Sequence, residues 1–198
     1  MDALPREIIV REQAGICRWI GRMNPKLYWI NGPWPGKLAI SSRPRGGDWL
    51  EDEISGWRKA GVDAVVSLLT PQENEDLQLG PESNLAQARG LLFLALPVED
   101  RGVPPSWDDA SQAVGKIGEM LRQGRNVAVH CRQGIGRSGM IAAAVLVKGG
   151  STPDDALKLI SDVRGLPVPE TPEQREWVRR FSKREVPSAL PLTRASVK

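Results

Sequence analysis

The sequence is poor in the residues that build metal centres and disulfide frameworks. Its 198 residues include one histidine, His130, and two cysteines, Cys17 and Cys131, which are far apart in the chain. This composition excludes a multi-histidine metal site and a disulfide scaffold. A chain of this length can bury a sizeable core without covalent cross-links. We therefore expect a reduced, cytoplasmic protein that needs neither a metal nor an organic cofactor.

Long apolar runs and blocks of like charge are also missing. The longest apolar run, Met140–Val147, is far shorter than the ~20 residues of a membrane span. The N-terminus has no apolar signal core. The net charge is +3 and the lysines and arginines are spread along the chain, which is no nucleic-acid signature. We expect a soluble monomer with no nucleic-acid partner and no membrane association.

Apolar segments that alternate with helical signals predict an α/β protein. Three apolar runs are predicted as buried strands, namely residues 64–69, which include β-branched residues, 91–96 and 126–129. Two shorter segments, residues 27–30 and 37–41, are predicted as further strands separated by a Pro/Gly turn. Strands that alternate with helices form a largely parallel sheet. The predicted fold is a single α/β domain, with a central, mostly parallel sheet flanked by helices on both faces.

Helices are predicted from capping residues and from apolar residues at helical spacing. Residues 71–90 are expected to hold one or two short helices. The expected caps of longer helices are Asp48, Ser106, Thr152 and Thr171. A further helix over residues 137–148 is apolar on every side through most of its length, which places it in the interior of the domain.

Three parts of the chain differ in pattern. Residues 1–26 show no clear signal and are expected to form an N-terminal arm. Residues 27–183 carry the predicted strands and helices and are expected to form the domain. Residues 184–198 hold proline, serine and charge without a period, which predicts a disordered tail.

The most informative segment is residues 126–139, NVAVHCRQGIGRSG. A buried strand is predicted to end at His130 and a helix to begin near Arg137, at the kind of strand end where open α/β sheets bind ligands. Gly134 and Gly136 allow backbone conformations in which successive N–H groups turn inward and bind an anion. The following helix adds partial positive charge. Because no Gly-Lys-Ser/Thr follows, the loop is not of the Walker type.

Three side chains give this loop the chemistry of nucleophilic phosphoryl transfer. The positive field at the helix start favours a thiolate at Cys131, which attacks phosphorus well at neutral pH. The planar guanidinium of Arg137 can hold two phosphate oxygens at once, and Ser138 can hydrogen-bond the sulfur and ease its departure. A lone Cys–Arg spacing is common by chance, and many cysteines are small core residues. The strand, the two glycines, the serine and the buried helix favour the catalytic interpretation.

Residues 130–139 resemble the signature loop of the protein tyrosine phosphatase superfamily, in which His-Cys is followed by five residues and then by Arg-Ser/Thr. The short chain resembles the dual-specificity branch and, within it, the cyclin-dependent kinase inhibitor-associated phosphatases. The resemblance runs from residue 28 to residue 181. It implies the cysteine phosphatase fold and hydrolysis of phosphomonoesters through a phosphocysteine intermediate. The residues that it implies for substrate binding are Arg132, Gln133, Gly134, Ile135, Gly136 and Arg137.

A second motif, Leu-Pro-Val-Glu-Asp-Arg-Gly-Val-Pro, occupies residues 96–104 after a predicted strand. The family places its general acid in such a loop, in the pattern Asp-x-Gly-x-Pro, which Asp100, Gly102 and Pro104 match. A phenoxide or alkoxide leaves poorly unless it is protonated, so the resemblance implies that Asp100 is this acid. The alternative is an ordinary solvated loop residue, and Glu99 is the neighbouring carboxylate most able to take its place.

Two further residues have both a structural and a functional interpretation. Related phosphatases often carry a glutamine before the last helix, near the hydrolytic water, and Gln174 matches that position. Thr171 and Gln174 also have the spacing of an ordinary capping box, so both interpretations stay open. His130 is expected to orient the loop rather than to act as an acid or base.

The sequence constrains the substrate less than the chemistry. Phosphoinositide phosphatases tend to carry extra lysines in this loop, which here has none. The resemblance therefore favours phosphotyrosine, or mixed phosphotyrosine and phosphoserine/threonine, in a phosphorylated protein or peptide. The alternatives are a phosphoinositide or RNA 5′-phosphatase with the same loop, a rhodanese-type sulfurtransferase, whose loop is typically shorter, and a non-catalytic phosphopeptide-binding module.

Overall fold

The computed structural model describes residues 26–185. The strands of this part of the chain are β1 (Tyr28–Ile30), β2 (Leu38–Ser42), β3 (Ala64–Ser67), β4 (Leu92–Ala95) and β5 (Val127–Cys131). Its helices are the 3₁₀ helix η1 (Gly47–Trp49), α1 (Leu50–Lys59), α2 (Pro71–Asp76), α3 (Glu82–Ala88), α4 (Trp107–Arg122), α5 (Arg137–Lys148), α6 (Pro153–Arg164) and α7 (Pro172–Glu185).

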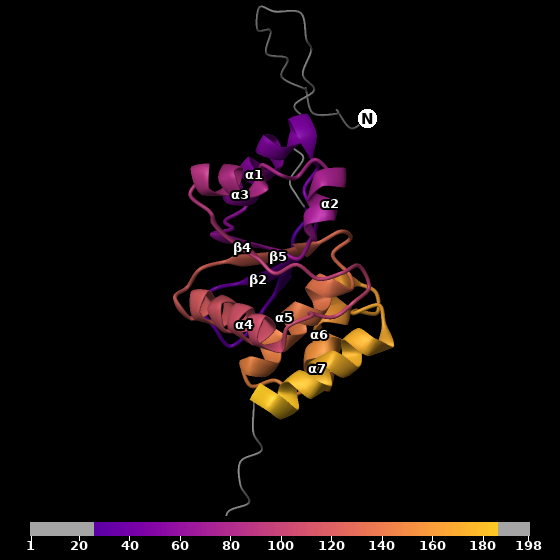
Figure 1. The fold of residues 1–198 in the computed structure, drawn as a ribbon. Helices are drawn as coiled ribbons and strands as arrows, with labels where there is room; N and C mark the ends of the chain where they lie inside the picture. The colour runs from indigo at the N-terminus through magenta and orange to yellow at the C-terminus, as the bar shows by residue number, and fades with distance from the viewer. Residues whose placement is uncertain (1–25, 186–198) are drawn as a thin grey trace, which may run out of the picture.

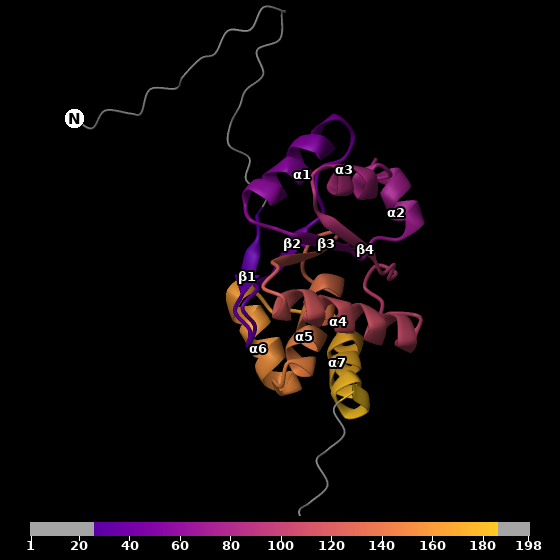
Figure 2. The same ribbon diagram turned by 90° about the vertical axis from the view of Figure 1, so that its left-hand side faces the viewer.

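The strands form one mixed sheet in the order β1-β2-β5-β3-β4. Strand β1 runs antiparallel to β2, and the other neighbouring strands are parallel. Figures 1 and 2 show α1, α2 and α3 on one face of the sheet and α4, α5, α6 and α7 on the other. The predicted fold, a mostly parallel sheet flanked by helices on both faces, is confirmed.

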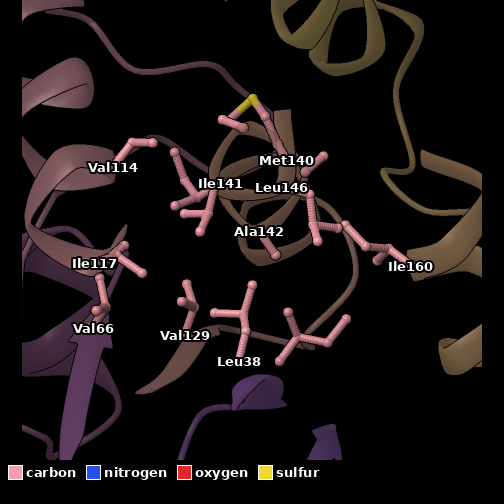
Figure 3. Packing of buried hydrophobic residues seen from close by; sticks show 14 of the residues in the cluster. Leu38, Val66, Val114, Ile117, Val129, Met140, Ile141, Ala142, Leu146 and Ile160 are labelled. Carbon is pink, nitrogen blue, oxygen red and sulfur yellow. The ribbon is translucent and has the colours of Figure 1, made fainter. Parts of the chain in front are cut away.

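The larger core lies between the sheet and the helices around α5. Side chains alternate along each strand, so Leu38, Val66 and Val129 reach the same face of the sheet. Figure 3 shows these three side chains opposite α5, with Val114 and Ile117 of α4 beside them. Helix α5 is buried along its whole length except for its last residue. It is therefore the interior helix that its apolar sequence predicts.

A smaller core covers the opposite face. There Ala39, Val65 and Ala128 of the three central strands pack against Ile54 and Trp57 of α1. This second core fixes the sheet from the α1 side, so the central strands are buried on both faces. Strands buried in this way have near-continuous apolar sequences, which is why the segments 64–69 and 126–129 could be recognised.

The carboxyl ends of the parallel strands meet at one edge of the sheet. In the register of the ladders, Ser42 of β2 pairs with Cys131 of β5, and Ser67 of β3 pairs with His130. The segments that follow these strands therefore start close together, although they are far apart in the sequence. This edge is where the sequence predicts ligand binding.

The predicted caps differ in outcome. Ser106 and Thr152 cap α4 and α6 as expected, because each hydroxyl oxygen accepts from the backbone N–H three residues on. The prediction that Asp48 caps a helix is wrong. Residues Gly47–Trp49 form a 3₁₀ turn that leads directly into α1 at Leu50, so Asp48 lies inside that turn.

Helix α7 continues to Glu185, so Arg184 and Glu185 are helical and not part of a disordered tail. Nζ of Lys148 donates to the carboxylate of Glu185 at 2.9 Å, and the guanidinium of Arg184 lies over the ring of Trp107. These contacts attach the last turn to α4 and α5. The remainder of the predicted tail and the predicted arm, residue 26 excepted, lie outside the described residues.

Residues 26–185 contain neither a membrane span nor a metal cluster. No helix in this range is both long enough and apolar enough to cross a bilayer. The same range holds no group of three or more histidine, cysteine, aspartate or glutamate side chains placed to bind a metal ion.

Candidate active site

The predicted nucleophile lies at the end of β5. Cys131 is only 3% exposed, and its Sγ lies 3.3 Å from Oγ of Ser138 in the first turn of α5. Residues 132–136, here called the phosphate loop, connect β5 to α5. A cavity of about 150 Å³ beside them is lined by Asp100, Arg101, Cys131, Arg132, Gln133, Ile135, Gly136, Arg137 and Glu170. Five of the six residues predicted to bind substrate therefore line one cavity.

The sixth residue, Gly134, supports the phosphate loop from behind. Its φ is +69°, and a Cβ at this position would lie 2.6 Å from the backbone carbonyl of Ser41 and 2.7 Å from the backbone nitrogen of Ser42. Glycine tolerates this left-handed conformation at little cost, and it also lets the loop rest directly on the end of β2. Gly134 is therefore required by both backbone conformation and close packing.

Arg137 is almost completely enclosed by protein groups. Its side chain is 1% exposed, and its Nη1 and Nη2 donate to Oε2 and Oε1 of Glu73 at 2.7 and 2.9 Å. Nη1 also donates to the carbonyl oxygen of Val98 at 2.8 Å. The bidentate pair with Glu73 fixes the plane of the guanidinium. This leaves its opposite side turned to the cavity.

Glu73 owes its position to the start of α2. The hydroxyl of Thr70 accepts from the backbone N–H of Glu73, and the Glu73 carboxylate accepts from the backbone N–H of Thr70, which makes a complete capping box. One carboxylate therefore closes the cap of α2 and holds Arg137 at the same time. Glu73 was not predicted from the sequence. The Thr70–Glu73 spacing after a buried strand indicates the cap, but nothing in it indicates the arginine.

Charge pairing sets the protonation of both partners. Burial alone would lower the pKa of Arg137, but its hydrogen bond to Glu73 and the negative charges of Cys131, Glu73 and Asp100 raise it above its ordinary value. Burial alone would raise the pKa of Glu73, but hydrogen bonds from Arg137 and Thr70 lower it below its ordinary value. Both groups are therefore charged at neutral pH.

Asp100 belongs to residues 97–104, here called the acid loop, and it also contacts Arg137. Its Oδ1 accepts from Nη2 of Arg137 at 2.8 Å, although its side chain is 53% exposed. A guanidinium has five N–H groups, and Glu73, Val98 and Asp100 use those of Nη1 and Nη2. Within the described residues, the Nε–H of Arg137 is the one without a partner. Asp100 therefore occupies the Nη2–H group, which a phosphate needs, together with Nε–H, to bind Arg137 through two oxygens.

Gln174 connects the acid loop with the phosphate loop. Its side chain is fully buried, and its Nε2 donates to the carbonyl oxygen of Gly102 at 2.9 Å. A Cβ on Gly136 would lie 3.0 Å from Oε1 of Gln174, and this oxygen has no hydrogen-bond partner within residues 26–185. Only half of the predicted capping box forms. The hydroxyl of Thr171 accepts from the backbone N–H of Gln174, but the Gln174 side chain binds Gly102 instead of returning to the backbone of Thr171. The side chain of Gln174 is directed to the site.

His130 lies on the opposite face of the sheet from the cavity. It is fully buried, and its ring lies 5.5 Å from that of Trp57, measured between ring centroids. Its Nε2 is 2.9 Å from Oε1 of the buried Glu82, a contact with the distance of an ion pair but without the alignment of a hydrogen bond. This position agrees with a role in orienting the strand end rather than with contact to a ligand.

The sequence matches a family model over residues 40–151, and that model is "Polymorphic toxin system, DSP-PTPase phosphatase". The chain belongs to this phosphatase family. It is a cysteine-type phosphatase with the dual-specificity protein tyrosine phosphatase fold. The resemblance stated from the residues of the phosphate loop and the acid loop is therefore confirmed.

Similarity to individual proteins extends beyond the range of the family model. "Cyclin-dependent kinase inhibitor 3" of Rattus norvegicus is 25% identical over 134 residues, which are 67% of this DSP-PTPase and 63% of the relative. "Phosphatidylglycerophosphate phosphatase PTPMT2" of Arabidopsis thaliana is 31% identical over 136 residues, which are 68% of this chain and 57% of the relative. The match thus spans less than two thirds of either relative's length.

Solved structures share the fold of this DSP-PTPase. A kinase associated phosphatase (KAP) whose catalytic cysteine is replaced by serine has a TM-score of 0.76 at 18% identity, covering 85% of this chain and 100% of that chain. Tk-PTP in its active form has a TM-score of 0.67 at 29% identity, covering 82% and 99%. At its low identity, the first structure supports the fold alone.

The acid loop of this DSP-PTPase separates its two neighbouring carboxylates. Asp100 lines the cavity, whereas Glu99, the alternative acid considered from the sequence, is not among the lining residues. Arg101 between the loop's acid and Gly102 has a φ of +61°, a left-handed conformation that non-glycine residues rarely adopt. The turn at Arg101 and Gly102 directs Asp100 toward Arg137.

Proposed function

We propose that this DSP-PTPase hydrolyses phosphomonoesters with Cys131 as nucleophile, Arg137 as phosphate clamp and Asp100 as general acid. The observation that carries the proposal is the convergence of these three side chains on one cavity, from β5, α5 and the acid loop. A thiolate, a guanidinium and a carboxyl group are the groups that transfer of a phosphoryl group to sulfur requires.

The first step begins when the substrate phosphate takes the place of Asp100 on Arg137. One phosphate oxygen binds Nη2 and a second binds Nε, while Glu73 keeps the other side of the guanidinium. The Cys131 thiolate attacks phosphorus, so that the sulfur–phosphorus bond forms and the bond to the leaving oxygen breaks. Asp100, released from Arg137 and protonated, gives its proton to that oxygen.

In the second step, water cleaves the phosphocysteine. Asp100, now a carboxylate, takes a proton from the water as its oxygen attacks phosphorus. The sulfur leaves as a thiolate, and a hydrogen bond from the hydroxyl of Ser138, 3.3 Å away, stabilises it. Oε1 of Gln174 has no hydrogen-bond partner among the described residues, which supports a role for this residue in positioning the water. The proposed steps use no metal or organic cofactor.

The substrate that we propose is phosphotyrosine, or phosphotyrosine together with phosphoserine/threonine, in a protein or peptide. The phosphate loop contains no lysine. The similarity to cyclin-dependent kinase inhibitor 3, a protein named for its action on a kinase, supports a protein substrate for this chain.

A phosphorylated lipid headgroup is the second candidate substrate. The Arabidopsis relative, at 31% identity, is a phosphatidylglycerophosphate phosphatase. In addition, Arg101 and Arg132 line the cavity beside Arg137. Two further cations suit a substrate with a phosphodiester close to its phosphomonoester.

Hydrolysis of a generic aryl phosphate tests the proposed chemistry. We expect the wild type to turn over in the presence of a chelator. Cys131→Ser should lose at least ~10⁴-fold in kcat, because a serine hydroxyl is not ionised near neutral pH. Full activity in Cys131→Ser would overturn the proposal. Turnover of thiosulfate by an otherwise inactive wild type would instead support a sulfurtransferase, and tight phosphate binding without turnover would support a binding module.

Competing substrates test the proposed substrate class. We expect kcat/KM for phosphotyrosyl and phosphothreonyl peptides to exceed kcat/KM for phosphatidylglycerophosphate, phosphatidylinositol 5-phosphate and 5′-phosphorylated RNA by at least ~10-fold. Arg132→Gln is the variant compared with wild type, since it removes a cation from the cavity and leaves Cys131 and Arg137 unchanged. If the lipid is the better substrate and Arg132→Gln lowers only its kcat/KM, the lipid replaces the peptide in the proposal.

A further inference from the structure

Three successive carbonyl groups of the phosphate loop accept hydrogen bonds from residues outside it. The carbonyl oxygen of Arg132 accepts from the backbone N–H of Arg43 at 3.4 Å. Those of Gln133 and Gly134 accept from Nη2 and Nε of Arg164, at 3.1 and 2.9 Å. Arg164 is the last residue of α6. A single side chain thus holds two consecutive peptide groups of the loop.

The direction of these carbonyls determines the direction of the loop's N–H groups. Within the described residues the one cis peptide bond is Val168–Pro169, so the peptide bonds of the phosphate loop are trans. In a planar trans peptide the C=O and the following N–H point in opposite directions. Because Arg164 binds the carbonyls of Gln133 and Gly134, the N–H groups of Gly134 and Ile135 point away from α6. Ile135 lines the cavity, so N–H groups with this orientation are available to an anion bound there.

We infer that Arg164 is a positioning residue of the phosphate site, which acts by holding the peptide groups of the phosphate loop in their anion-binding orientation. The inference rests on the proposed function. Gly134 makes such a clamp necessary, since a glycine at a φ of +69° leaves the adjoining peptide groups free to rotate. If the Gly134–Ile135 peptide turned over, the site would exchange an N–H donor for a carbonyl oxygen, which repels phosphate.

The guanidinium of Arg164 is itself held on the ring of Tyr28. The centre of the guanidinium lies 4.0 Å from the ring centroid, and the ring also carries the ammonium of Lys26 at 4.9 Å. Tyr28 belongs to β1 and is the one tyrosine of the sequence. No carboxylate forms an ion pair with Arg164 in the part of the chain that the structure describes. The planar fork is therefore directed to the loop carbonyls, and its charge also favours an anion nearby.

Arginine is better suited to this position than lysine. Nε and Nη2 lie in one plane and donate in parallel, which matches two consecutive carbonyl oxygens. An ammonium group is a point charge and can replace one of these bonds at best. This gives a graded series, in which Arg164→Lys keeps part of the function and Arg164→Gln loses it, while Tyr28→Leu keeps the arginine but removes the ring beneath it.

Two measurements report on the anion site rather than on folding. The first is calorimetric binding of inorganic tungstate, which needs no turnover. The second is the rate ratio for alkylation of Cys131 by iodoacetate and by iodoacetamide, followed by mass spectrometry. The anionic reagent uses the loop N–H groups and the neutral one does not, so a change in the exposure of Cys131 that affects both reagents equally cancels in the ratio.

We expect Arg164→Gln to weaken tungstate binding and to lower the alkylation ratio by roughly 10-fold each, the loss of about one charge-assisted hydrogen bond. Arg164→Lys should restore part of both, and Tyr28→Leu should change both by roughly 3-fold in the same direction. The matched control is Arg58→Gln. Arg58 also lies in the last turn of a helix and donates to a backbone carbonyl, that of Val62 at 3.2 Å. It is remote from the loop, and its substitution should change neither value.

Values within twofold of wild type in Arg164→Gln would overturn the inference. So would equal losses in Arg164→Gln and Arg58→Gln. If Arg164→Gln does not fold, Arg164→Lys and Tyr28→Leu decide the question by the same two measurements. A wild type that binds tungstate but hydrolyses no phosphomonoester would refute the proposed function, and Arg164 would still be tested as part of an anion-binding site.

Discussion

The phosphate loop and the acid loop face the same cavity but are held by different kinds of contact. The phosphate loop is anchored in the interior: its flanking residues Cys131 and Arg137 are 3% and 1% exposed, and Gly134 rests on the backbone of β2. The acid loop is open, since the side chain of Asp100 is 53% exposed and reaches Arg137 through a single hydrogen bond. The anion-binding half of the site is therefore packed into the protein and held by several buried contacts, whereas the acid is placed by one polar contact that a phosphate can replace.

Of the substitutions that test this comparison, Asp100→Asn is expected to have the largest effect on activity. We expect kcat for an aryl phosphate to fall by about a thousandfold, since the general acid is lost. Binding of orthophosphate should become tighter, because a neutral amide competes with phosphate for Arg137 less well than a carboxylate does. The measurements are kcat and calorimetric orthophosphate binding.

Glu99→Gln is the matched control for Asp100→Asn, because it removes the adjacent carboxylate, which does not line the cavity. It should leave kcat and orthophosphate binding near their wild-type values. Weaker orthophosphate binding in Asp100→Asn would contradict the exchange of Asp100 for phosphate on Arg137.

Gly134→Ala tests the packed half of the site. The added Cβ would lie 2.6 Å from the backbone of Ser41, so the phosphate loop must shift, and displacements of about 1 Å can reduce rates by about 100-fold. We expect a loss of that order in kcat/KM. Gly124→Ala separates this clash from backbone strain, because Gly124 has a φ of +81° and a Cβ added there would have no atom within 4 Å. It should lower the melting temperature and leave kcat/KM unchanged; equal activity losses would argue against the clash.

Glu73→Gln tests the partner that holds Arg137 between the two loops. Loss of a charged, bidentate hydrogen bond is expected to lower kcat/KM for an aryl phosphate by roughly 10-fold. Glu53→Gln is the matched control, since Glu53 pairs with Arg45 at 2.7 Å with a side-chain exposure of 11%, away from the cavity. If both variants lose activity equally, the Glu73–Arg137 pair has no particular role in the site.

The effect of Glu73→Gln on the melting temperature is expected to depend on pH. The pKa of Glu73 is lowered in the folded protein, so its ionised form stabilises the fold at pH values above the ordinary glutamate pKa. This stabilisation is lost as the pH falls through the lowered value. The difference in melting temperature between wild type and Glu73→Gln should therefore be largest near neutral pH and shrink on acidification. A difference that grows at low pH would contradict the assigned direction.

Gln174→Ala is expected to have the smallest effect, because it removes one contact between the loops. We expect the second step, hydrolysis of the phosphocysteine, to slow by roughly 3- to 10-fold, which corresponds to the loss of about one hydrogen bond. A larger pre-steady-state burst would reveal the slower second step. Thr171→Ala removes the cap of α7 and keeps the amide of Gln174. It should lower the melting temperature without changing the burst, and the opposite pattern would favour the capping role alone.

Local patterns accounted for much of the fold and for the centre of the site. The apolar segments 64–69 and 126–129, which contain most of β3 and β5, are properties of short stretches of chain. So are the caps at Ser106 and Thr152 and the apolar helix over residues 137–148. The same holds for Cys131, Arg137 and Ser138, which one loop brings together. The prediction for Asp48 was wrong because a 3₁₀ turn moved the start of α1 to Leu50, a choice that depends on packing and not on the capping residue.

By itself the sequence determined which segments form strands and helices, and which loop carries the nucleophile and the arginine. Tertiary structure alone decided the partners of these groups. Arg137 meets Glu73 across 64 residues and Asp100 across 37, Gln174 meets Gly102 across 72, and Arg164 meets Gly134 across 30. Periodicity and capping are short-range effects that extend over a few residues. Contacts between distant residues exist only where the sheet aligns its strand ends and the two cores fix the loops that follow them.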